Sequence, residues 1–588
     1  MNTMSIFAKL SWYFKEEWKT YLVGVGGLIL TALLAIIPPR IIGLLVDAIH
    51  SGKLAASTLI MLLILLTAVA IAQYGSRYMW RTAIWGEAAK LEKVLRNRLF
   101  WHYTQMDQEF FQKYRTGDLM AHATNDLSAI QRVAGGGILQ FADSMITGGT
   151  TLIAMVSLID WRLTIIAIIP FPLLAVMARY MGSKIHVAFR DSQAAFSRLN
   201  NKAEESITGI KVIKGLGQQE EDMADFDDQV AQTININRRV NRLDSLFDPM
   251  TTMIISLSYV ITIVYGGYLV TTGQITIGAL VSFVSYLAMM IWPMFAVGML
   301  FNTLERGNAS YDRVMDLLNQ TSKVIDDPNG ATTAPRGEID YDVEKFSYPG
   351  DNRLALENIN FKIPAGKTVG LVGRVGSGKS TILRLMLRQF DNYTGTIKFG
   401  GIDIRHYKMD ALIPAIGYVP QDTFLFSDSI RENIRFARPE ASQEAVETAA
   451  KKSDLYNQIK GMPDGYDTAV GEEGISLSGG QRQRLAIARA LLINPELLIL
   501  DDALSAVDAE TETQILRNLR AERKEKTTII SAHRLSSVMD ADEILVINDG
   551  QIVERGTHDQ LMANNGWYKE MFERQELETK VKGGAQNG

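Results

Sequence analysis

The strongest constraint on the fold of this chain is a set of long stretches without a charged side chain. Tyr21–Pro39, Leu54–Ser76 and the run from Pro249 to Leu304 contain no Asp, Glu, Lys or Arg. A transmembrane helix needs about 20 consecutive apolar residues, and the third run is long enough for two, with the polar turn Thr271–Gln274 between them. Core helices of soluble proteins rarely reach this length without a charge, so the sequence predicts a membrane protein.

Two more apolar stretches bring the predicted number of membrane spans to six. Val133–Ile159 contains one acid, Asp143, and Leu163–Ala178 contains none. Together with the first three runs they predict an all-α transmembrane domain over residues 1–318, with long polar connections after the second and fourth spans. The predicted spans are residues 20–47, 54–80, 133–159, 162–182, 247–271 and 275–303.

The distribution of lysine and arginine predicts the orientation of these spans. Lysine and arginine are rare in the short turns at residues 49–54, 160–162 and 271–275, where Lys53 and Arg162 are the only two. The two long connections contain many lysines and arginines. Loops with an excess of lysine and arginine stay in the cytoplasm. We therefore expect both termini and both long connections to be cytoplasmic.

The composition changes after residue 318. Residues 319–336 read as a linker, residues 337–575 have the alternating pattern of a soluble α/β domain, and residues 576–588 form a polar tail. The 60 basic and 65 acidic residues give a net charge of −5, which argues against binding of nucleic acid. The absence of cysteine excludes disulfides, thiolate metal sites and cysteine nucleophiles.

A phosphate-binding loop stands near the start of the α/β domain, between a β-type run at 368–372 and a helical run at 381–388. Its glycines allow backbone N–H groups to surround phosphates, and the helix N-terminus adds partial positive charge. The lysine of the pattern reaches the β- and γ-phosphates of ATP, and the following hydroxyl binds Mg²⁺. The predicted ATP-binding residues here are Gly373, Arg374, Val375, Gly376, Ser377, Gly378, Lys379, Ser380 and Thr381.

A second element of the predicted ATP site is Asp501. It ends the buried strand pattern Glu496–Leu500. A carboxylate at the tip of a strand beside the P-loop lies where Mg²⁺ needs a further protein contact. The sequence thus predicts a multidomain membrane protein in which a six-helix transmembrane domain is followed by a cytoplasmic α/β P-loop ATPase domain.

The pentapeptide Leu477-Ser478-Gly479-Gly480-Gln481, which opens a helical run, resembles the signature of the ABC transporter ATPases. With six spans before the ATPase domain, nearly the whole chain resembles an ABC exporter half-transporter. The run of motifs is most similar to the BmrC- and LmrC-type subunits of heterodimeric bacterial multidrug exporters. The resemblance implies a protein integral to the bacterial cytoplasmic membrane.

The resemblance also implies roles for single residues. Tyr348 matches the aromatic residue that stacks on adenine, with an ordinary surface tyrosine as the alternative. Gln421 matches a loop residue that contacts Mg²⁺, and Asp508 matches the D-loop. His533 follows a strand and matches the switch histidine near the γ-phosphate, with a structural histidine as the alternative.

In this family two ATPase domains close around two ATP molecules, so the resemblance implies a second half-transporter. Ser478, Gly479, Gly480 and Gln481 would then contact the ATP bound to the partner. The general base of the family is a glutamate after the metal-binding aspartate, and this chain has Asp502 there. The carboxylate is one methylene shorter, which implies the degenerate ATP site of a heterodimer. The alternative is a homodimer in which Asp502 is the working base.

The nature of the substrate is left open by the residues. Asp143 lies within a predicted span and could attract cationic amphiphiles, or it could lie at the interface. Trp292 lies among methionines that suit a promiscuous apolar site, and packing against lipid explains them as well. We expect export of amphiphilic, often cationic small molecules across the lipid bilayer. Flipping of a lipid or lipopeptide, and a nucleotide-gated channel, are the alternatives.

Overall fold

The computed structural model describes residues 5–584, apart from the side-chain surroundings of residues 175, 178, 179, 298, 473 and 579–584. The chain forms two compact units. The first consists of the residues up to Thr104 together with Thr116–Gln320, and the second of Gln105–Arg115 together with Thr321 onward. The short segment 105–115 thus groups with the C-terminal unit, although the sequence connects it on both sides to the helical one.

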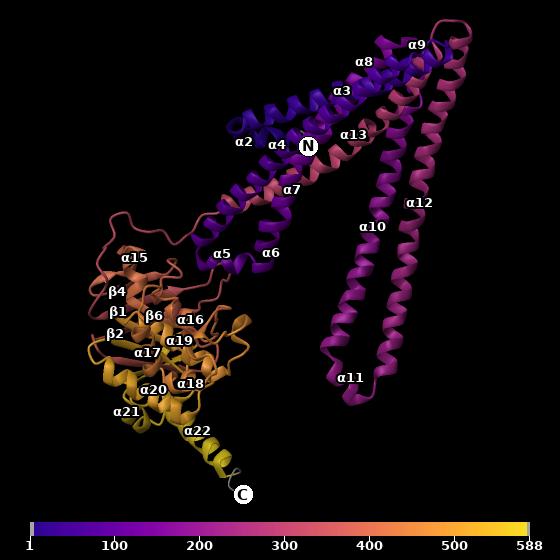
Figure 1. Ribbon diagram of the computed structural model, residues 1–588. Helices are drawn as coiled ribbons and strands as arrows, with labels where there is room; N and C mark the ends of the chain where they lie inside the picture. Colours follow the sequence, from indigo (N-terminus) through magenta and orange to yellow (C-terminus); the bar gives the residue numbers. More distant parts are fainter. Residues whose placement is uncertain (1–4, 585–588) are drawn as a thin grey trace. The chain divides into compact units, whose positions relative to one another are not determined.

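The first unit is helical throughout its described length (Figure 1). Short π-helical stretches at His122–Asp126 and Val133–Gly137 link three of its helices into one continuous rod. The α-helices of this unit are α1 (Ser5–Lys9), α2 (Ser11–Glu16), α3 (Trp18–His50), α4 (Ala56–Thr104), α6 (Thr116–Ala121), α7 (Leu127–Arg132), α8 (Ile138–Leu158), α9 (Trp161–Ile168), α10 (Phe171–Thr208), α11 (Ile210–Leu216), α12 (Gln219–Thr271) and α13 (Ile277–Leu318).

Five helical stretches among the described residues are long and apolar enough to cross a membrane. They are Trp18–His50, Ala56–Thr104, Thr116–Leu158, Gln219–Thr271 and Ile277–Leu318. The fourth predicted span, 162–182, instead falls on two helices, because α9 ends at Ile168 and α10 begins at Phe171. Pro170 lies in the break, and a proline lacks the N–H that would continue the helical hydrogen bonds.

Helices α10 and α12 run side by side as a long hairpin, joined by the short helix α11 at its tip (Figure 1). Every residue of α11 is at least partly exposed. The hairpin extends far beyond its apolar part, which accounts for the long polar connection that the sequence predicts after the fourth span. The connection after the second span is formed by the C-terminal part of α4 and by the helices that follow it.

Helices α3 and α13 approach each other closely through glycine. A Cβ atom added at Gly43 would lie 2.0 Å from Ser282 Oγ and 2.4 Å from the carbonyl oxygen of Gly278. The Ser282 hydroxyl donates a hydrogen bond to the carbonyl oxygen of Pro39 at 2.8 Å. Small residues let two helix backbones come together in a membrane, where packing replaces the hydrophobic effect as the source of association.

We therefore expect Gly43→Ala to destabilise the helical unit by about 1–3 kcal/mol, the usual cost of overpacking. The matched control is Gly26→Ala on the same helix, where an added Cβ would have no neighbour within 4 Å. The measurement is the thermal unfolding of the detergent-purified chain. Equal unfolding temperatures for the two variants would contradict the packing argument.

The second unit contains α5 (Gln108–Lys113) and an α/β domain with two sheets. The antiparallel sheet has the strand order β2-β1-β4-β5, with β1 (Ile339–Phe346), β2 (Leu356–Ile363), β4 (Thr394–Phe399) and β5 (Ile402–Asp403). The larger sheet has the order β10-β9-β3-β8-β7-β6, with β3 (Thr368–Gly373), β6 (Ile416–Val419), β7 (Leu497–Asp501), β8 (Thr527–Ser531), β9 (Glu543–Asn548) and β10 (Gln551–Gly556).

The centre of the larger sheet is parallel and fully buried. Strand β8 pairs in parallel with β3 on one side and with β7 on the other, and all residues of β7 and β8 are buried. Helices cover the sheet, as expected for buried parallel strands. The α-helices of this unit besides α5 are α14 (Lys379–Met386), α15 (Met409–Leu412), α16 (Ile430–Arg435), α17 (Gln443–Lys452), α18 (Tyr456–Lys460), α19 (Gly479–Leu492), α20 (Ala509–Glu522), α21 (His558–Ala563) and α22 (Trp567–Gly584).

The segments at both ends of the α/β domain are more ordered than their composition suggests. The segment predicted as a linker packs on the domain, because Arg388 donates to the carbonyl oxygen of Ile325 at 2.7 Å and Ala331 forms a bridge with Tyr407. Helix α22 includes residues 576–584 of the predicted polar tail, and residues 585–588 lie outside the described part.

The segment predicted as a linker also holds helix α5 in this unit. The Asp107 carboxylate accepts hydrogen bonds from the N–H groups of Phe110, at 3.0 Å, and Lys323, at 2.5 Å. These hydrogen bonds lower the pKa of Asp107 against the raising effect of its burial. They hold residues 105–115 in the C-terminal unit.

Candidate nucleotide-binding site

The predicted phosphate loop lies between β3 and α14, in the strand–loop–helix setting that the pattern requires. Two of its positions admit only glycine. A Cβ at Gly373 would lie 2.1 Å from the carbonyl oxygen of Ile547, and Gly378 has a φ of +109°. The glycines therefore serve the path of the backbone, which leaves the loop N–H groups and the first turn of α14 facing one cavity.

Lys379 is held inside this loop. Its Nζ donates hydrogen bonds to the carbonyl oxygens of Gly373, at 2.9 Å, and Arg374, at 3.0 Å. The residue is only 6% exposed, and burial lowers the pKa of its amine, while the nearby Asp501 and Asp502 oppose that shift. An anionic phosphate in the cavity would give this desolvated cation a stronger partner than two carbonyl groups.

Ser380 and Asp501 form the second part of the site. The Ser380 Oγ donates a hydrogen bond to Asp501 Oδ1 at 3.1 Å, across from the first turn of α14 to the end of β7. Burial, together with the nearby Asp501 carboxylate, raises the pKa of Tyr418 on β6 to about 12, so its hydroxyl stays protonated beside the site. Sequence reasoning did not identify Tyr418.

These residues could hold a magnesium ion together with nucleotide phosphates. Gln421 lines the same cavity as Ser380 and Asp501, so three oxygen donors are available. In the described part of the chain, no group of three or more His, Asp or Glu side chains could hold a metal ion. A partial set of oxygen donors suits Mg²⁺, which is usually bound by one or two carboxylates plus substrate phosphates.

The cavity between these elements has a volume of about 610 Å³, which is within the range of small-molecule sites. Most of the residues predicted to bind ATP or metal, or to take part in catalysis, line it. They are Tyr348, Val375, Gly376, Ser377, Gly378, Lys379, Ser380, Thr381, Gln421, Asp501, Asp502 and His533. Gly373 and Arg374 contribute through their carbonyl groups, which hold Lys379.

Tyr348 is fixed at one wall of this cavity. Its ring packs edge-on against Phe346 and Phe390, and its hydroxyl shares a hydrogen bond of 2.9 Å with Thr381 Oγ1. Arg384 Nη1 also donates to that hydroxyl at 3.4 Å. Tyr348 is thus tied to the first turn of α14 and lines the cavity, and its stacking on adenine stays a prediction.

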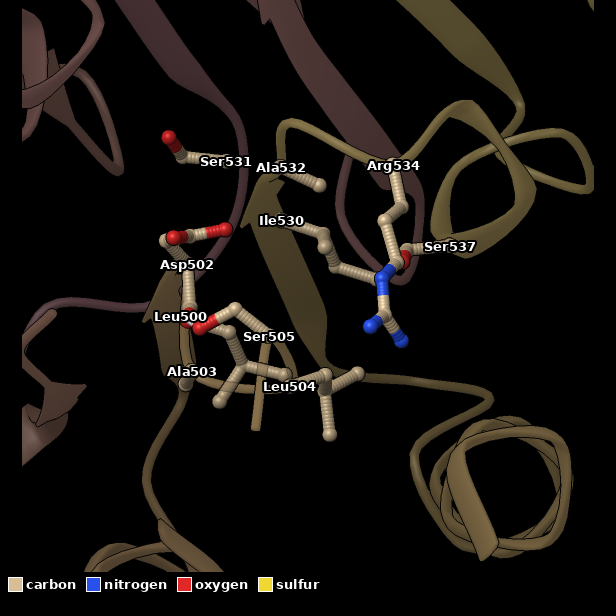
Figure 2. A pocket seen from close by; sticks show the side chains of 10 residues that line it. All are labelled: Leu500, Asp502, Ala503, Leu504, Ser505, Ile530, Ser531, Ala532, Arg534 and Ser537. Carbon is tan, nitrogen blue, oxygen red and sulfur yellow. Dashed lines mark hydrogen bonds between the residues drawn. The ribbon is translucent and has the colours of Figure 1, made fainter. Parts of the chain in front are cut away.

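Asp502 follows Asp501 in a left-handed backbone conformation, with a φ of +50°. Its N–H donates to the carbonyl oxygen of Ser531 at 2.8 Å, which ties the turn to the end of β8. Asparagine and aspartate tolerate this conformation better than most residues. Figure 2 shows the Asp502 carboxylate on the same side of a small pocket as Ser531, with the Arg534 guanidinium on the opposite side.

The loop that carries His533 is held by the C-terminal helix α22, a contact that sequence reasoning missed. Gln575 Nε2 donates to the carbonyl oxygen of His533 at 2.8 Å, and Gln575 Oε1 accepts from the N–H of Leu535 at 2.9 Å. No local pattern marks this glutamine, because its partners are backbone groups some forty positions earlier in the sequence.

The signature residues and Asp508 do not line the cavity. Ser478 caps α19 in a capping box with Gln481, in which each side chain bonds to the backbone of the other. Asp508 caps α20 by accepting from the N–H of Thr511, and this bond lowers the pKa of its carboxyl. The exposed Ser478 leaves the N-terminus of α19 accessible to a group outside this chain.

Gln483 connects the signature helix to the Asp502 turn. Its amide donates to Ser505 Oγ at 3.1 Å and accepts from the N–H of Ala506 at 2.9 Å. Ser505 Oγ in turn donates to the carbonyl oxygen of Asp502 at 2.9 Å. The first turns of α19 and the turn at Asp502 are thus parts of one hydrogen-bonded network.

Comparison with known proteins settles the family. The family profile described as "ABC transporter transmembrane region" matches residues 21–294, and the profile described as "ABC transporter" matches residues 356–505. The chain is an ABC exporter. It is 43% identical over 581 residues to the "Probable multidrug resistance ABC transporter ATP-binding/permease protein YheI" of Bacillus subtilis, with 99% of each chain covered.

One further relative and one solved structure also match this ABC exporter over nearly its whole length. The "Multidrug resistance-like ATP-binding protein MdlA" of Escherichia coli is 41% identical over 584 residues, and the match covers 99% of each chain. A solved structure, the "Structure of a bacterial Atm1-family ABC exporter with ATP bound", superposes with a TM-score of 0.76 at 28% identity, over 96% of this chain and 99% of the other. The chain is therefore an integral membrane protein whose ABC domain binds and hydrolyses ATP to drive transport.

We expect Gln575→Ala to loosen the His533 loop. Removal of the amide leaves the Leu535 N–H without the acceptor that Gln575 Oε1 provides, and the loss of one such hydrogen bond, about 1 kcal/mol, corresponds to roughly fivefold faster amide exchange. The measurement is hydrogen–deuterium exchange of a peptide covering residues 533–538. Glu578→Ala on the same helix is the control, and equal exchange in both variants would contradict the role of Gln575.

Proposed function

We propose that this chain is one subunit of a heterodimeric exporter of amphiphilic, often cationic small molecules, in which it carries the degenerate ATP site. The observation that carries the proposal is Asp502, at the general-base position, in a chain whose signature is intact. A shortened base in an otherwise complete set of motifs is expected when hydrolysis takes place mainly at the other ATP site.

The position and length of the Asp502 side chain support its proposed role as a weak general base. Asp502 lines the cavity with Lys379 and Asp501, so the position itself is retained. Its carboxylate is one methylene shorter than that of glutamate, which leaves it on the order of 1 Å from the ideal position for an attacking water. A displacement of this size can reduce a rate by about 100-fold. The site then binds Mg²⁺ and ATP through Ser380, Gln421 and Asp501 and hydrolyses ATP slowly.

The signature supports a role toward a partner. Ser478, Gly479, Gly480 and Gln481 lie at the N-terminus of the 14-residue helix α19, away from the cavity that this chain's own P-loop lines. The N-terminus of a helix favours an anion, here the γ-phosphate of ATP bound to the partner half-transporter. Asp508, at the N-terminus of α20, would also act toward the partner in this proposal.

The substrate class rests on the relatives, which are named as multidrug transporters. Within the helical unit, Asp143 accepts a hydrogen bond of 2.6 Å from Thr147, one turn along α8, and Trp292 is 58% exposed. An exposed aromatic and a carboxylate suit a cationic amphiphile. Both termini and the ATPase domain lie in the cytoplasm of a bacterial cell in this proposal, with lipid around the apolar spans.

The alternative is a homodimeric exporter, or a lipid or lipopeptide flippase, with Asp502 as the working base. It is favoured by one observation, the position of Asp502 inside the cavity rather than outside it. A modified base position that still lines the cavity could retain some activity.

The first test compares the two ATP sites of the assembled pair. Lys379→Ala removes the cation of this chain's own P-loop, so it should weaken nucleotide binding there and leave appreciable steady-state hydrolysis. The equivalent lysine change in the partner should abolish turnover. Equal loss from the two changes, measured as phosphate release by the purified pair, would contradict the asymmetric assignment.

The second test concerns the signature. Gly479→Asp should reduce hydrolysis by the pair by about 100-fold or more, because a carboxylate would face the γ-phosphate of the partner's ATP. Folding should be preserved, since an acid in the first turn of α19 is favourable for the helix. The control is Gly479→Ala, whose Cβ would be in ordinary contact with Ala506 Cβ at 3.4 Å. Near-normal activity of the aspartate variant would contradict a composite site.

A further inference from the structure

The hydroxyl of Ser531 is a buried polar group without a partner at the wall of the nucleotide cavity. The residue is 2% exposed, and its Oγ makes no hydrogen bond within the described part of the chain. A buried hydroxyl without a partner destabilises the fold, so such groups are rare unless a ligand or a water satisfies them. Neither the P-loop pattern nor the family signature includes this serine.

The sheet fixes the direction of this side chain. Ser531 is the last residue of β8, where it lies in register with Leu371 on β3 and with Asp501 on β7. Residues in register on adjacent strands project on the same face of a sheet. Ser531 therefore shares the face of Asp501, whose carboxylate accepts the hydrogen bond from Ser380.

Its neighbours indicate which end of a nucleotide it would contact. Ser531 lines the cavity with Asp501, Asp502 and His533, whereas Tyr348 is the aromatic residue of the cavity. Figure 2 shows the Ser531 hydroxyl and the Asp502 carboxylate on the same side of the small pocket that both residues line. The acids and the switch histidine are the groups assigned to the γ-phosphate end, and the tyrosine is the group assigned to adenine.

We propose that Ser531 is a further ATP-binding residue, whose hydroxyl donates a hydrogen bond at the γ-phosphate end of bound Mg·ATP, to a phosphate oxygen or to a water held on it. The proposal rests on the ATP site described above but not on the asymmetry between two subunits. It explains why a polar side chain is buried between the P-loop strand and the metal-binding strand without a partner of its own.

A structural water is the competing explanation. A small cavity of about 10 Å³, close to the size of one water, is lined by Ser531, Asp502, Ser505, Arg534 and Ser537. If a permanent water there were the partner of Ser531, loss of the hydroxyl would lower the stability of the nucleotide-free protein. If ATP is the partner, the nucleotide-free protein loses nothing.

The experiment uses the full-length chain purified alone in detergent, so that only its own P-loop site is measured. The affinities for Mg·ATP and Mg·ADP and the unfolding temperature without nucleotide are compared for the parent, Ser531→Ala and Ser531→Thr, with Lys379→Ala as the variant that lacks binding. We expect Ser531→Ala to weaken Mg·ATP binding by about 3- to 10-fold, the effect of one hydrogen bond. Mg·ADP binding and the unfolding temperature should be unchanged, and Ser531→Thr should restore the affinity for Mg·ATP.

Three results would overturn the proposal: unchanged Mg·ATP affinity in Ser531→Ala, an equal loss for Mg·ATP and Mg·ADP, or a lower unfolding temperature without nucleotide. If the parent shows no ATP binding that depends on Lys379, the ATP site itself is wrong, and this proposal is wrong with it. The asymmetric role of Asp502 is untouched by the first three results, because it is measured by the rate of hydrolysis and not by the affinity for nucleotide.

Discussion

Parallel pairing of one central strand, β8, with both β3 and β7 is the interaction on which the nucleotide site depends. Because the carboxyl ends of parallel strands meet at one edge of a sheet, the phosphate loop after β3, Asp501 at the end of β7 and the His533 loop after β8 face a common cavity. The fully buried strands hold these loops rigidly. Small differences in side-chain length, such as aspartate in place of glutamate, therefore matter for the chemistry.

Sequence patterns that are local in the chain were predictable. The apolar runs predicted the membrane helices. The spacing from Gly373 to Ser380 predicted the strand–loop–helix and the position of Lys379, because each of these patterns depends only on neighbouring residues. The break at Pro170 was not predicted, since an apolar run without charge has the same composition whether its helix is continuous or interrupted. The docking of the segment at 321–331 on the ATPase domain depends on distant partners such as Arg388 and Tyr407 and leaves no local signal.

The distinction between local patterns and distant contacts also explains which residues of the nucleotide site were predicted. Lys379, Ser380 and Asp501 belong to motifs, whereas Gln575, Gln483 and Ser531 act through backbone groups or neighbours that only the fold brings close. Gln483 is the most instructive of them, because it joins the signature helix to the turn at Asp502. In the proposed heterodimer, this glutamine would connect the signature, which faces the partner's ATP, to the weak base of this chain's own ATP site.

The most direct test of the central claim, that Asp502 is not a working base, is the ATPase rate of the full-length chain purified alone, with and without Asp502→Asn. Asparagine suits the left-handed backbone at this position, so the variant should fold normally. The account predicts slow hydrolysis that Asp502→Asn changes by less than about twofold, since loss of a functional general base costs about 100-fold or more. Brisk hydrolysis by the chain alone, abolished by Asp502→Asn, would contradict the account and establish a homodimer with aspartate as its base.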